Sequence, residues 1–197
     1  MSTLPKIVQA GHPVLRDAAK RVPEEMFGSA ELASLIRTMV DVMRAAPGVG
    51  LAAPQIGVGL RVIVMEDVSS TMARLSDAER AERGRVELPL TILVNPELRP
   101  TDERRATFFE GCLSVGGYMA LVERHLDVAL VGVDADGKKV DLRLSGWPAR
   151  IAQHELDHLD GTLYVDRMLS RSLCENREMQ ARYVGRSIEE IRAALKV

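Results

Sequence analysis

The sequence lacks an excess of positive charge, since it has 26 lysines and arginines against 28 aspartates and glutamates, a net charge of −2. A protein that binds nucleic acid through its phosphates needs a basic surface to displace counterions. The chain also has no apolar stretch near the ~20 residues that a membrane span requires, and it does not begin with the charged and then apolar layout of a signal peptide. We therefore expect neither nucleic acid, sequence-specific or not, nor a membrane among its partners.

Cysteine and histidine are also scarce. The two cysteines, Cys112 and Cys174, are expected to be free thiols, because a pair in a chain without a secretion signal is seldom bridged. Two of the four histidines fall in one pentad, HELDH, at positions 154–158. This concentration of a rare residue type makes the pentad the first candidate for a functional site.

The first half of the chain predicts one amphipathic helix followed by strands. The length of 197 residues suits a single domain, 1–197. Between residues 31 and 45 the apolar side chains recur at helical spacing, which predicts a helix that faces the core. Two β-branched apolar runs predict buried strands at 60–65 and 92–98. The polar stretch 66–90 between them is expected to be an excursion on the surface.

The second half predicts a hairpin and then a helix that carries the pentad. Residues 126–144 are typical of two strands around an Asp136-Gly137 turn. A helix is expected at 145–161, with proline in its first turn and glycine at its end. The polar tail, 169–197, is expected to be peripheral and to end in a short helix. The sequence predicts strands before and after the motif region and only a few helices. This pattern indicates an α+β fold, with antiparallel or mixed sheets packed around the central HELDH helix.

Helical geometry explains the spacing of the pentad. Residues four apart lie within about 40° of each other around a helix, so His154 and His158 project from one face. Two imidazoles at this spacing can bind one metal ion. Glu155 lies about 100° away, where it can take a proton from water at the metal and return it to a leaving group. The structural alternative is a buried histidine pair without a metal.

Two histidines need a third ligand, because a catalytic metal normally has three protein ligands and one open position. His12 follows a glycine in a turn and His125 begins a strand, so both are poor candidates. Cys112, in EGCLSV, is a better candidate, since its thiolate would complete a Cys-His-His set that suits zinc or ferrous iron. The alternative role for this cysteine is that of a small buried hydrophobic residue.

Three stretches taken together resemble the signature motifs of peptide deformylase: GVGLAAPQ (48–55), EGCLS (110–114) and HELDH (154–158). The opening KIVQAGHPVLRDAA resembles that family too, so the likeness covers about residues 6–168, and GGYMALVER resembles its organellar-type branch. The resemblance implies a hydrolase that removes the formyl group from N-formylmethionine of nascent polypeptides and releases formate. Its expected partners are formylmethionyl peptides and, through them, the ribosome. A bacterial cytoplasmic location is expected, and an organellar one after removal of a leader is the alternative.

The resemblance also implies a role for particular residues. The positions that correspond to the family's metal ligands are Cys112, His154 and His158. The family's catalytic acid and base corresponds to Glu155, and its donors to the developing oxyanion correspond to the Gln55 side chain and the Leu113 backbone N–H. One divalent ion per chain is implied, Fe²⁺ in the cell, with Zn²⁺, Ni²⁺ or Co²⁺ able to substitute.

Several residues near the motifs are candidates for binding the peptide. Those expected to line an apolar slot for the methionine side chain are Val49, Leu51 and Ile151. Gly48 and Gly50 would let the loop backbone approach an extended peptide that pairs with it as an added strand. A tight structural turn is the alternative for this loop, which lacks the Gly-Lys-Ser/Thr ending of a phosphate-binding loop.

Three charged residues near the motifs are candidates for binding the peptide or for orienting the loops. Arg150 lies one turn before His154, so we expect it near the same face, where it can meet the peptide backbone. Glu110 is expected to orient the neighbouring loops through Arg124. The alternative is that these charges are solvated.

Two other functions compete with a deformylase. A zinc endopeptidase uses the same HExxH helix but takes its third ligand downstream, where this chain offers Glu175 and Glu178 but no histidine. A structural or regulatory metal protein needs neither a proton shuttle nor an oxyanion donor, so Glu155 and Gln55 argue against it. The EGCLS motif upstream of the helix is the feature that separates these possibilities.

Overall fold

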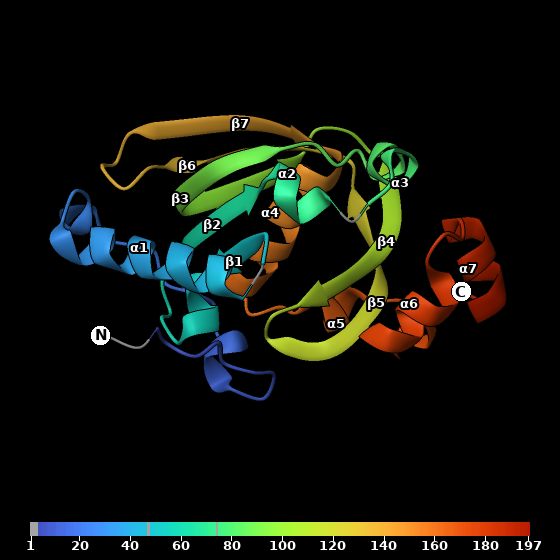
Figure 1. Ribbon diagram of the computed structural model, residues 1–197. Helices are drawn as coiled ribbons and strands as arrows, with labels where there is room; N and C mark the ends of the chain where they lie inside the picture. The colour runs from blue at the N-terminus through green and yellow to red at the C-terminus, as the bar shows by residue number, and fades with distance from the viewer. Residues whose placement is uncertain (1–3, 47, 74) are drawn as a thin grey trace.

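The computed structural model describes residues 4–46, 48–73 and 75–197, and it has the predicted α+β fold (Figure 1). The strands are β1 (Gly50–Ala52), β2 (Val62–Asp67), β3 (Leu88–Pro100), β4 (Arg105–Cys112), β5 (Val115–His125), β6 (Asp127–Val133), β7 (Lys139–Ser145) and β8 (Cys174–Glu175). The α-helices are α1 (Ala30–Ala45), α2 (Ser69–Met72), α3 (Asp77–Glu82), α4 (Gly146–Leu159), α5 (Tyr164–Arg167), α6 (Asn176–Tyr183) and α7 (Ile188–Leu195). Short 3-10 turns are η1 (Pro13–Leu15), η2 (Glu24–Met26), η3 (Ala53–Ile56) and η4 (Ser170–Ser172).

Five strands form an antiparallel sheet in the order β1-β2-β3-β6-β7. Successive side chains of a strand point to opposite faces of the sheet. In β2, Val62 and Val64 belong to one buried cluster, whereas Ile63 and Met65 belong to another. Both faces of β2 are therefore buried, which explains why the sequence has an uninterrupted apolar run here rather than an alternating one.

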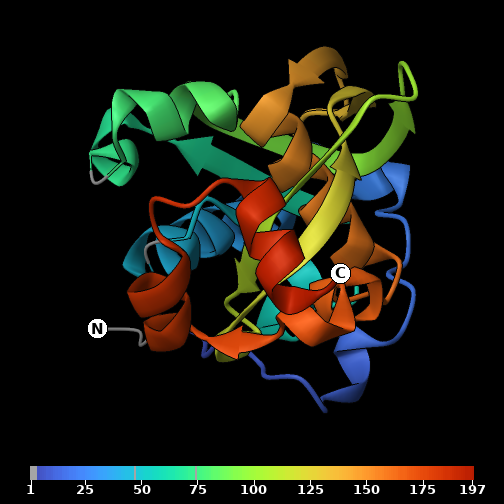
Figure 2. The same ribbon diagram turned by 90° about the vertical axis from the view of Figure 1, so that its right-hand side faces the viewer.

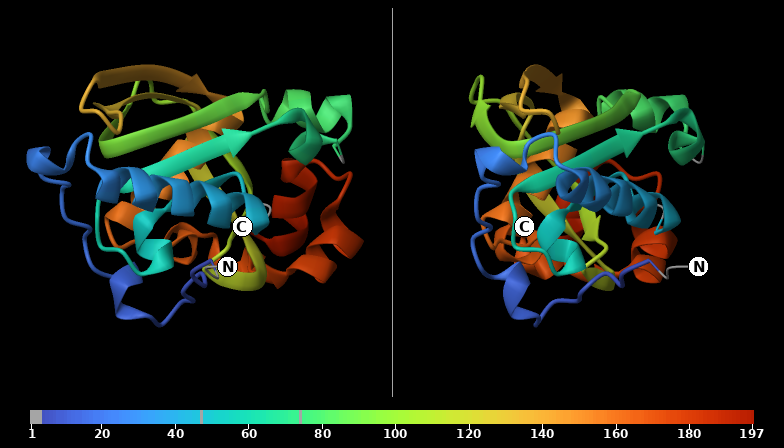
Figure 3. Two further views of the ribbon diagram at one scale, coloured as in Figure 1. Left: turned by 60° about the vertical axis from the view of Figure 1, so that its left-hand side comes forward. Right: turned by 90° about the vertical axis from the view of Figure 1, so that its left-hand side faces the viewer.

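Two helices cover the two faces of this sheet. α1 packs its apolar stripe against the Val62 side, and Figure 3 shows it running alongside β2. It begins after Ser29, whose hydroxyl accepts a hydrogen bond from the Leu32 N–H and so caps the helix. α4 packs against the opposite side, through Ile151 and Leu156. The helix that carries HELDH is therefore central, as predicted.

A second antiparallel sheet has the order β4-β5-β8. Its main part is the long hairpin of β4 and β5, and Figure 2 shows α6 and α7 in front of it. α4 contacts β5 as well as β1, β2 and β3, so it lies between the two sheets. This position brings one face of α4 close to the end of β4, where Cys112 lies.

The structure corrects the predicted course of β3. The strand runs from Leu88 to Pro100 rather than over 92–98, and it continues through Pro96. Its register shifts between Val94 and Glu97, and Asn95 has a φ of 52°. This bulge accommodates the proline, which cannot donate a hydrogen bond to the neighbouring strand.

Two polar segments contain more structure than the sequence predicts. The 66–90 excursion carries α2 and α3 and the first residues of β3, and it buries the side chains of Met72 and Leu88. The 169–197 tail contains the predicted terminal helix as α7, together with α6 and the short strand β8. The helices within the described ranges include none with the length and apolar character needed to cross a membrane.

Candidate metal centre

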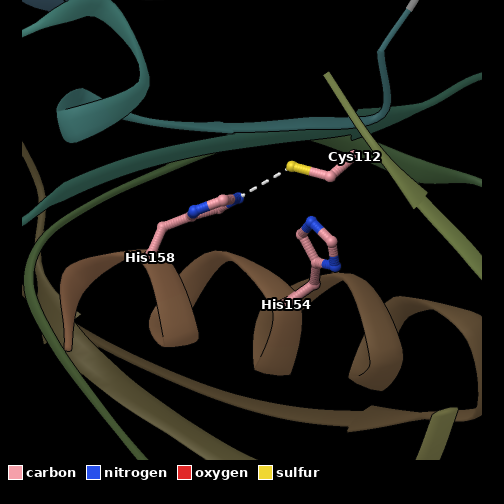
Figure 4. Close-up of side chains that lie close together, drawn as sticks. All are labelled: Cys112, His154 and His158. Atoms are coloured by element: carbon pink, nitrogen blue, oxygen red, sulfur yellow. Dashed lines mark hydrogen bonds between the residues drawn. The ribbon is translucent and has the colours of Figure 1, made fainter. Parts of the chain in front are cut away.

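Three potential metal ligands converge between α4 and the end of β4 (Figure 4). Ligand atoms of Cys112, His154 and His158 all lie within 4.8 Å of one another, and the Cys112 Sγ is 3.2 Å from the His158 Nε2. Burial lowers the pKa of His158 well below its ordinary value, which favours the neutral imidazole that a metal requires. Within the described ranges this set contains no fourth protein ligand. A sulfur and two imidazole nitrogens with one open position fit a catalytic zinc or ferrous ion.

Local structure accounts for the convergence. His154 and His158 lie one turn apart on α4, with Trp147 and Ile151 on the same stripe facing the interior. Cys112 is the last residue of β4, where the pairing shifts from Gly111 opposite Met119 to Cys112 opposite Val115. An irregularity of this kind bends the strand and redirects a side chain. Here it places the thiol over the helix.

A buried ionic network holds the first histidine. The His154 Nδ1 lies 3.0 Å from the Glu110 Oε2, which leaves its Nε2 for the metal. Glu110 also accepts hydrogen bonds from the guanidinium of Arg124, which in turn donates to Asp157. Burial alone would raise the pKa of Glu110, but Arg124 and His154 hold it well below its ordinary value. The Glu110–Arg124 pair is therefore buried and not solvated, and it joins β4 and β5 to His154 and Asp157 of the HELDH pentad.

Glu155, the next residue of α4, lies beside Gly50 of β1. Its side chain is buried, and its Oε2 has no hydrogen-bond partner among the residues that the structure describes. Burial raises the pKa of Glu155 to about 7. A buried carboxyl group without a partner, whose pKa lies near neutral pH, can both take up and release a proton, which suits a group that exchanges protons with a solvent molecule.

Gly50 lets β1 approach this carboxylate. A Cβ atom built on Gly50 would lie 2.2 Å from the Glu155 Oε1, and one on Gly48 would lie 2.8 Å from the Leu113 Cδ1. The two glycines therefore make room for protein side chains, besides any room that they leave for a peptide.

The Gln55 side chain is fixed at both ends. Its Oε1 accepts a hydrogen bond of 2.9 Å from the Ala52 N–H, which orients the amide. Its Nε2 consequently points to the metal ligands, 3.6 Å from the Cys112 Sγ and 3.3 Å from the Ser114 Oγ. This arrangement presents an N–H donor to the open side of the centre.

A pocket of about 390 Å³ leads to the centre. The residues expected at the peptide that line this pocket are Gly48, Val49, Gly50, Arg150 and Ile151, and the expected oxyanion donor Leu113 lines it as well. Leu51 is different, because its side chain is fully buried in the cluster beneath α1. Arg150 reaches the pocket wall, but its guanidinium donates to Glu110 and to the carbonyls of Val122 and Ala106. Its main contacts are therefore structural.

Several further residues line the pocket but were not predicted from the sequence, namely Arg83, Arg85, Phe109, Tyr118, Met119 and Asn176. They come from the 66–90 excursion, the β4–β5 hairpin and the tail, which no local pattern connects to HELDH. Glu110 was named from the sequence as a partner of Arg124, but its contact with His154 was not predicted. A signal for it exists, because a metal-binding histidine usually donates its second N–H to a carboxylate.

The remaining candidates for metal binding have other roles. His12 caps η1 by accepting a hydrogen bond from the Val14 N–H, and the His125 Nε2 lies 2.9 Å from an Arg105 nitrogen. Glu175 and Glu178 form ion pairs with neighbouring arginines of the tail. Cys112, the third member of the Cys-His-His group, therefore lies upstream of the HExxH helix, whereas a zinc endopeptidase takes its third ligand from downstream.

The α+β fold and its HExxH helix with an upstream cysteine define a protein with a Cys-His-His group that can hold a metal ion, beside which a buried carboxyl group lies. The family model described as polypeptide deformylase matches residues 4–173. The chain belongs to the polypeptide deformylase family.

Individual relatives agree with this assignment. Peptide deformylase 1 of Streptomyces coelicolor is 52% identical over 88% of this chain and 77% of its own length. The chloroplastic peptide deformylase 1A of Solanum lycopersicum is 49% identical over 86% of this chain, which spans only 61% of that protein. The Met-Ala-Ser-bound class I type b enzyme from Acinetobacter baumannii has a similar structure, with a TM-score of 0.75 and 32% identity over 85% of this chain and all of that one.

Proposed function

We propose that this protein is a hydrolase that removes the formyl group from N-formylmethionine at the start of nascent polypeptides and releases formate. The observation that carries the proposal is the buried Glu155 carboxylate beside a Cys-His-His group with an open position. A closed structural metal site needs no such carboxylate. Membership of the family and the peptide bound to the Acinetobacter baumannii relative support the choice of substrate.

The residues of the chain supply the remaining steps of amide hydrolysis. Cys112, His154 and His158 would hold a divalent ion, which supplies Lewis acidity and lowers the pKa of water to about 7. Glu155 accepts a proton from the attacking water and delivers it to the amine that leaves. The Gln55 Nε2 and the Leu113 backbone N–H donate hydrogen bonds to the carbonyl oxygen as it becomes negative, and one such donor contributes about 3 kcal/mol.

The pocket walls suit the substrate. Val49 and Ile151 present apolar surface beside the centre, and we propose that they contact the methionine side chain. A formyl group is the smallest acyl group, so a confined centre admits it and excludes larger ones. We place the activity wherever chains begin with formylmethionine, in the bacterial cytoplasm or in an organelle, and at the ribosome from which those chains emerge.

Formate release from formyl-Met-Ala-Ser by the metal-loaded protein tests the proposal. The matched substrate is acetyl-Met-Ala-Ser, which we expect to be inert because it differs only in the size of the acyl group. A longer acetylated peptide serves as the second control. Internal cleavage of that peptide without formate release from the first would favour an endopeptidase and overturn the proposal.

We propose Fe²⁺ as the metal in the cell. Removal of the metal by a chelator is expected to abolish formate release, because the chain offers no other Lewis acid. Addition of Fe²⁺ under anaerobic conditions should restore it fully, and Zn²⁺, Ni²⁺ or Co²⁺ to differing extents. Metal content and rate are measured on the same samples, and an unchanged rate in the metal-free protein would refute the metal-dependent mechanism.

Substitution of Gly50 tests the close approach of β1 to the catalytic carboxylate. Gly50→Ala places a methyl group within 2.2 Å of the Glu155 Oε1, so the carboxylate must move. A displacement of about 1 Å can reduce kcat by about 100-fold. We expect a loss of that order with the metal content unchanged. Gly59→Ala is the control, because its new methyl group would meet nothing within 4 Å.

A further inference from the structure

Three guanidinium groups surround the indole ring of Trp147 at one end of the pocket. The guanidinium carbons lie 5.5, 5.3 and 5.8 Å from the ring centroid in Arg83, Arg85 and Arg150, respectively. Contacts at this distance are attractive between a cation and the face of the ring, but they do not neutralise the charge. Three cations in one place therefore require carboxylates nearby.

Two of the three have such a partner. The Arg85 Nε donates to the fully buried Asp67 at 2.7 Å, and the Arg150 guanidinium donates to Glu110 at 2.6 Å. Arg83 forms neither an ion pair nor a side-chain hydrogen bond with any residue that the structure describes, and its Nε is buried without a partner. It is thus the cation of this cluster without a carboxylate in contact, because Glu79 and Glu82 raise its pKa only from a distance.

The carboxylates nearest to Arg83 along the chain are engaged elsewhere or exposed. The Glu79 Oε2 accepts hydrogen bonds from the backbone N–H and the hydroxyl of Ser76, and Glu82 is exposed on α3. Burial lowers the pKa of Arg83, as expected for a desolvated cation without a close partner. A carboxylate of a bound ligand could form the ion pair that the Arg83 guanidinium lacks.

Arg83 stands where two cavities meet. A second cavity of about 910 Å³ lies beside the metal pocket, lined by residues of α3, β4 and the C-terminal helices. The two cavities share the lining residues Arg83, Phe109 and Met119. The tail forms the far wall, where Tyr183 stacks on Phe109 with 5.7 Å between ring centroids. A peptide whose first residues fill the metal pocket can therefore continue past Arg83 into the second cavity.

We propose that the second cavity receives the downstream residues of the formylated peptide, and that Arg83 there binds an acidic side chain of this peptide. This inference rests on the proposed function. A guanidinium stacked on an aromatic face keeps its edge N–H groups free for two parallel hydrogen bonds to a carboxylate. The protein accordingly prefers chains that carry a carboxylate a few residues after formylmethionine, and the 66–90 excursion and the tail serve as walls of the specificity site.

The test uses formyl-Met tetrapeptide amides with glutamate or glutamine at position 2, 3 or 4 in turn. For the metal-loaded protein we expect kcat/KM to favour glutamate about three- to five-fold at one of these positions, through KM, as for a partly exposed ion pair. Arg83→Gln should bring this ratio to about 1. Arg83→Glu should reverse it, so that lysine at the same position is favoured over glutamine.

Each ratio compares two substrates of one variant, so a general loss of activity in a variant does not affect it. The matched control is Arg80→Gln, which removes an exposed arginine of α3 that pairs with Asp77 and should keep the ratio. Equal rates for glutamate and glutamine at all three positions in the unchanged protein would overturn the inference, as would a preference that survives Arg83→Gln. Absence of formate release from every peptide would instead refute the proposed function.

Discussion

Replacement of Glu155 by glutamine is expected to reduce formate release by about 100- to 10,000-fold, the usual contribution of a positioned general acid and base. Glutamine has the same size and fits the same buried site, but it cannot accept a proton from water. Cys112, His154 and His158 are unchanged, so the metal content should remain that of the original protein. Rate and metal content are measured together, the first as formate released and the second by elemental analysis.

The control for this change is Glu123→Gln, which removes a half-exposed glutamate of β5 that lies 3.6 Å from an Arg105 nitrogen. It should keep the full rate. Equal rates in Glu155→Gln and in the original protein would remove Glu155 from the mechanism. Loss of the metal in that variant would instead show that the carboxylate contributes to binding the ion.

Much of the metal centre follows from local rules. The positions of His154 and His158 require only that HELDH be helical, and that helix was indicated by Pro148 in its first turn and Gly161 after its end. Cys112 followed from the need for a third ligand and from the shortage of other donors. The roles of Gln55 and Leu113 came from the resemblance to a family, because no spacing rule connects η3 or the end of β4 to α4.

Residues whose role depends on tertiary packing were harder to predict. Leu51 follows Gly48 and Gly50 in the first motif and was expected to line the pocket. The three residues of β1 are all buried, however, and the Leu51 side chain packs in the cluster beneath α1. Arg150 lies on the predicted side of α4, yet Glu110 takes up its guanidinium. Neither outcome can be read from periodicity, because the first depends on the packing of α1 over β1 and the second on β4, which is distant from α4 in the sequence.

The same limit applies to the polar segments. Charge and low hydrophobicity predicted that 66–90 and 169–197 lie on the surface, although the first segment buries Met72 and Leu88 and the second buries Ile191. They gave no sign that Arg83 from the first segment and Asn176 from the second line the same pocket. That convergence depends on the long β4–β5 hairpin, whose length and direction place the tail opposite α3.

Glu110→Gln should have the largest effect on stability, because Glu110 is the carboxylate shared by Arg124 and Arg150 inside the fold. Both guanidiniums are buried, and removal of the charge leaves Arg150 without any carboxylate partner among the described residues. Loss of one partner of a buried ion pair costs about 3 to 5 kcal/mol. We expect the free energy of unfolding of the metal-free protein to fall by about that amount in urea titrations.

The same variant should also weaken metal binding, since Glu110 orients His154 through the Nδ1. Partners of this kind typically contribute about 10- to 100-fold in affinity. The matched control is Glu97→Gln, which removes an exposed carboxylate paired with Arg21 and should change neither quantity appreciably. If Glu110→Gln lost stability but kept its affinity for the metal, the network would support the fold alone. If it lost neither, the buried charges would not act as a unit, and the orientation of His154 would have to come from the packing of α4.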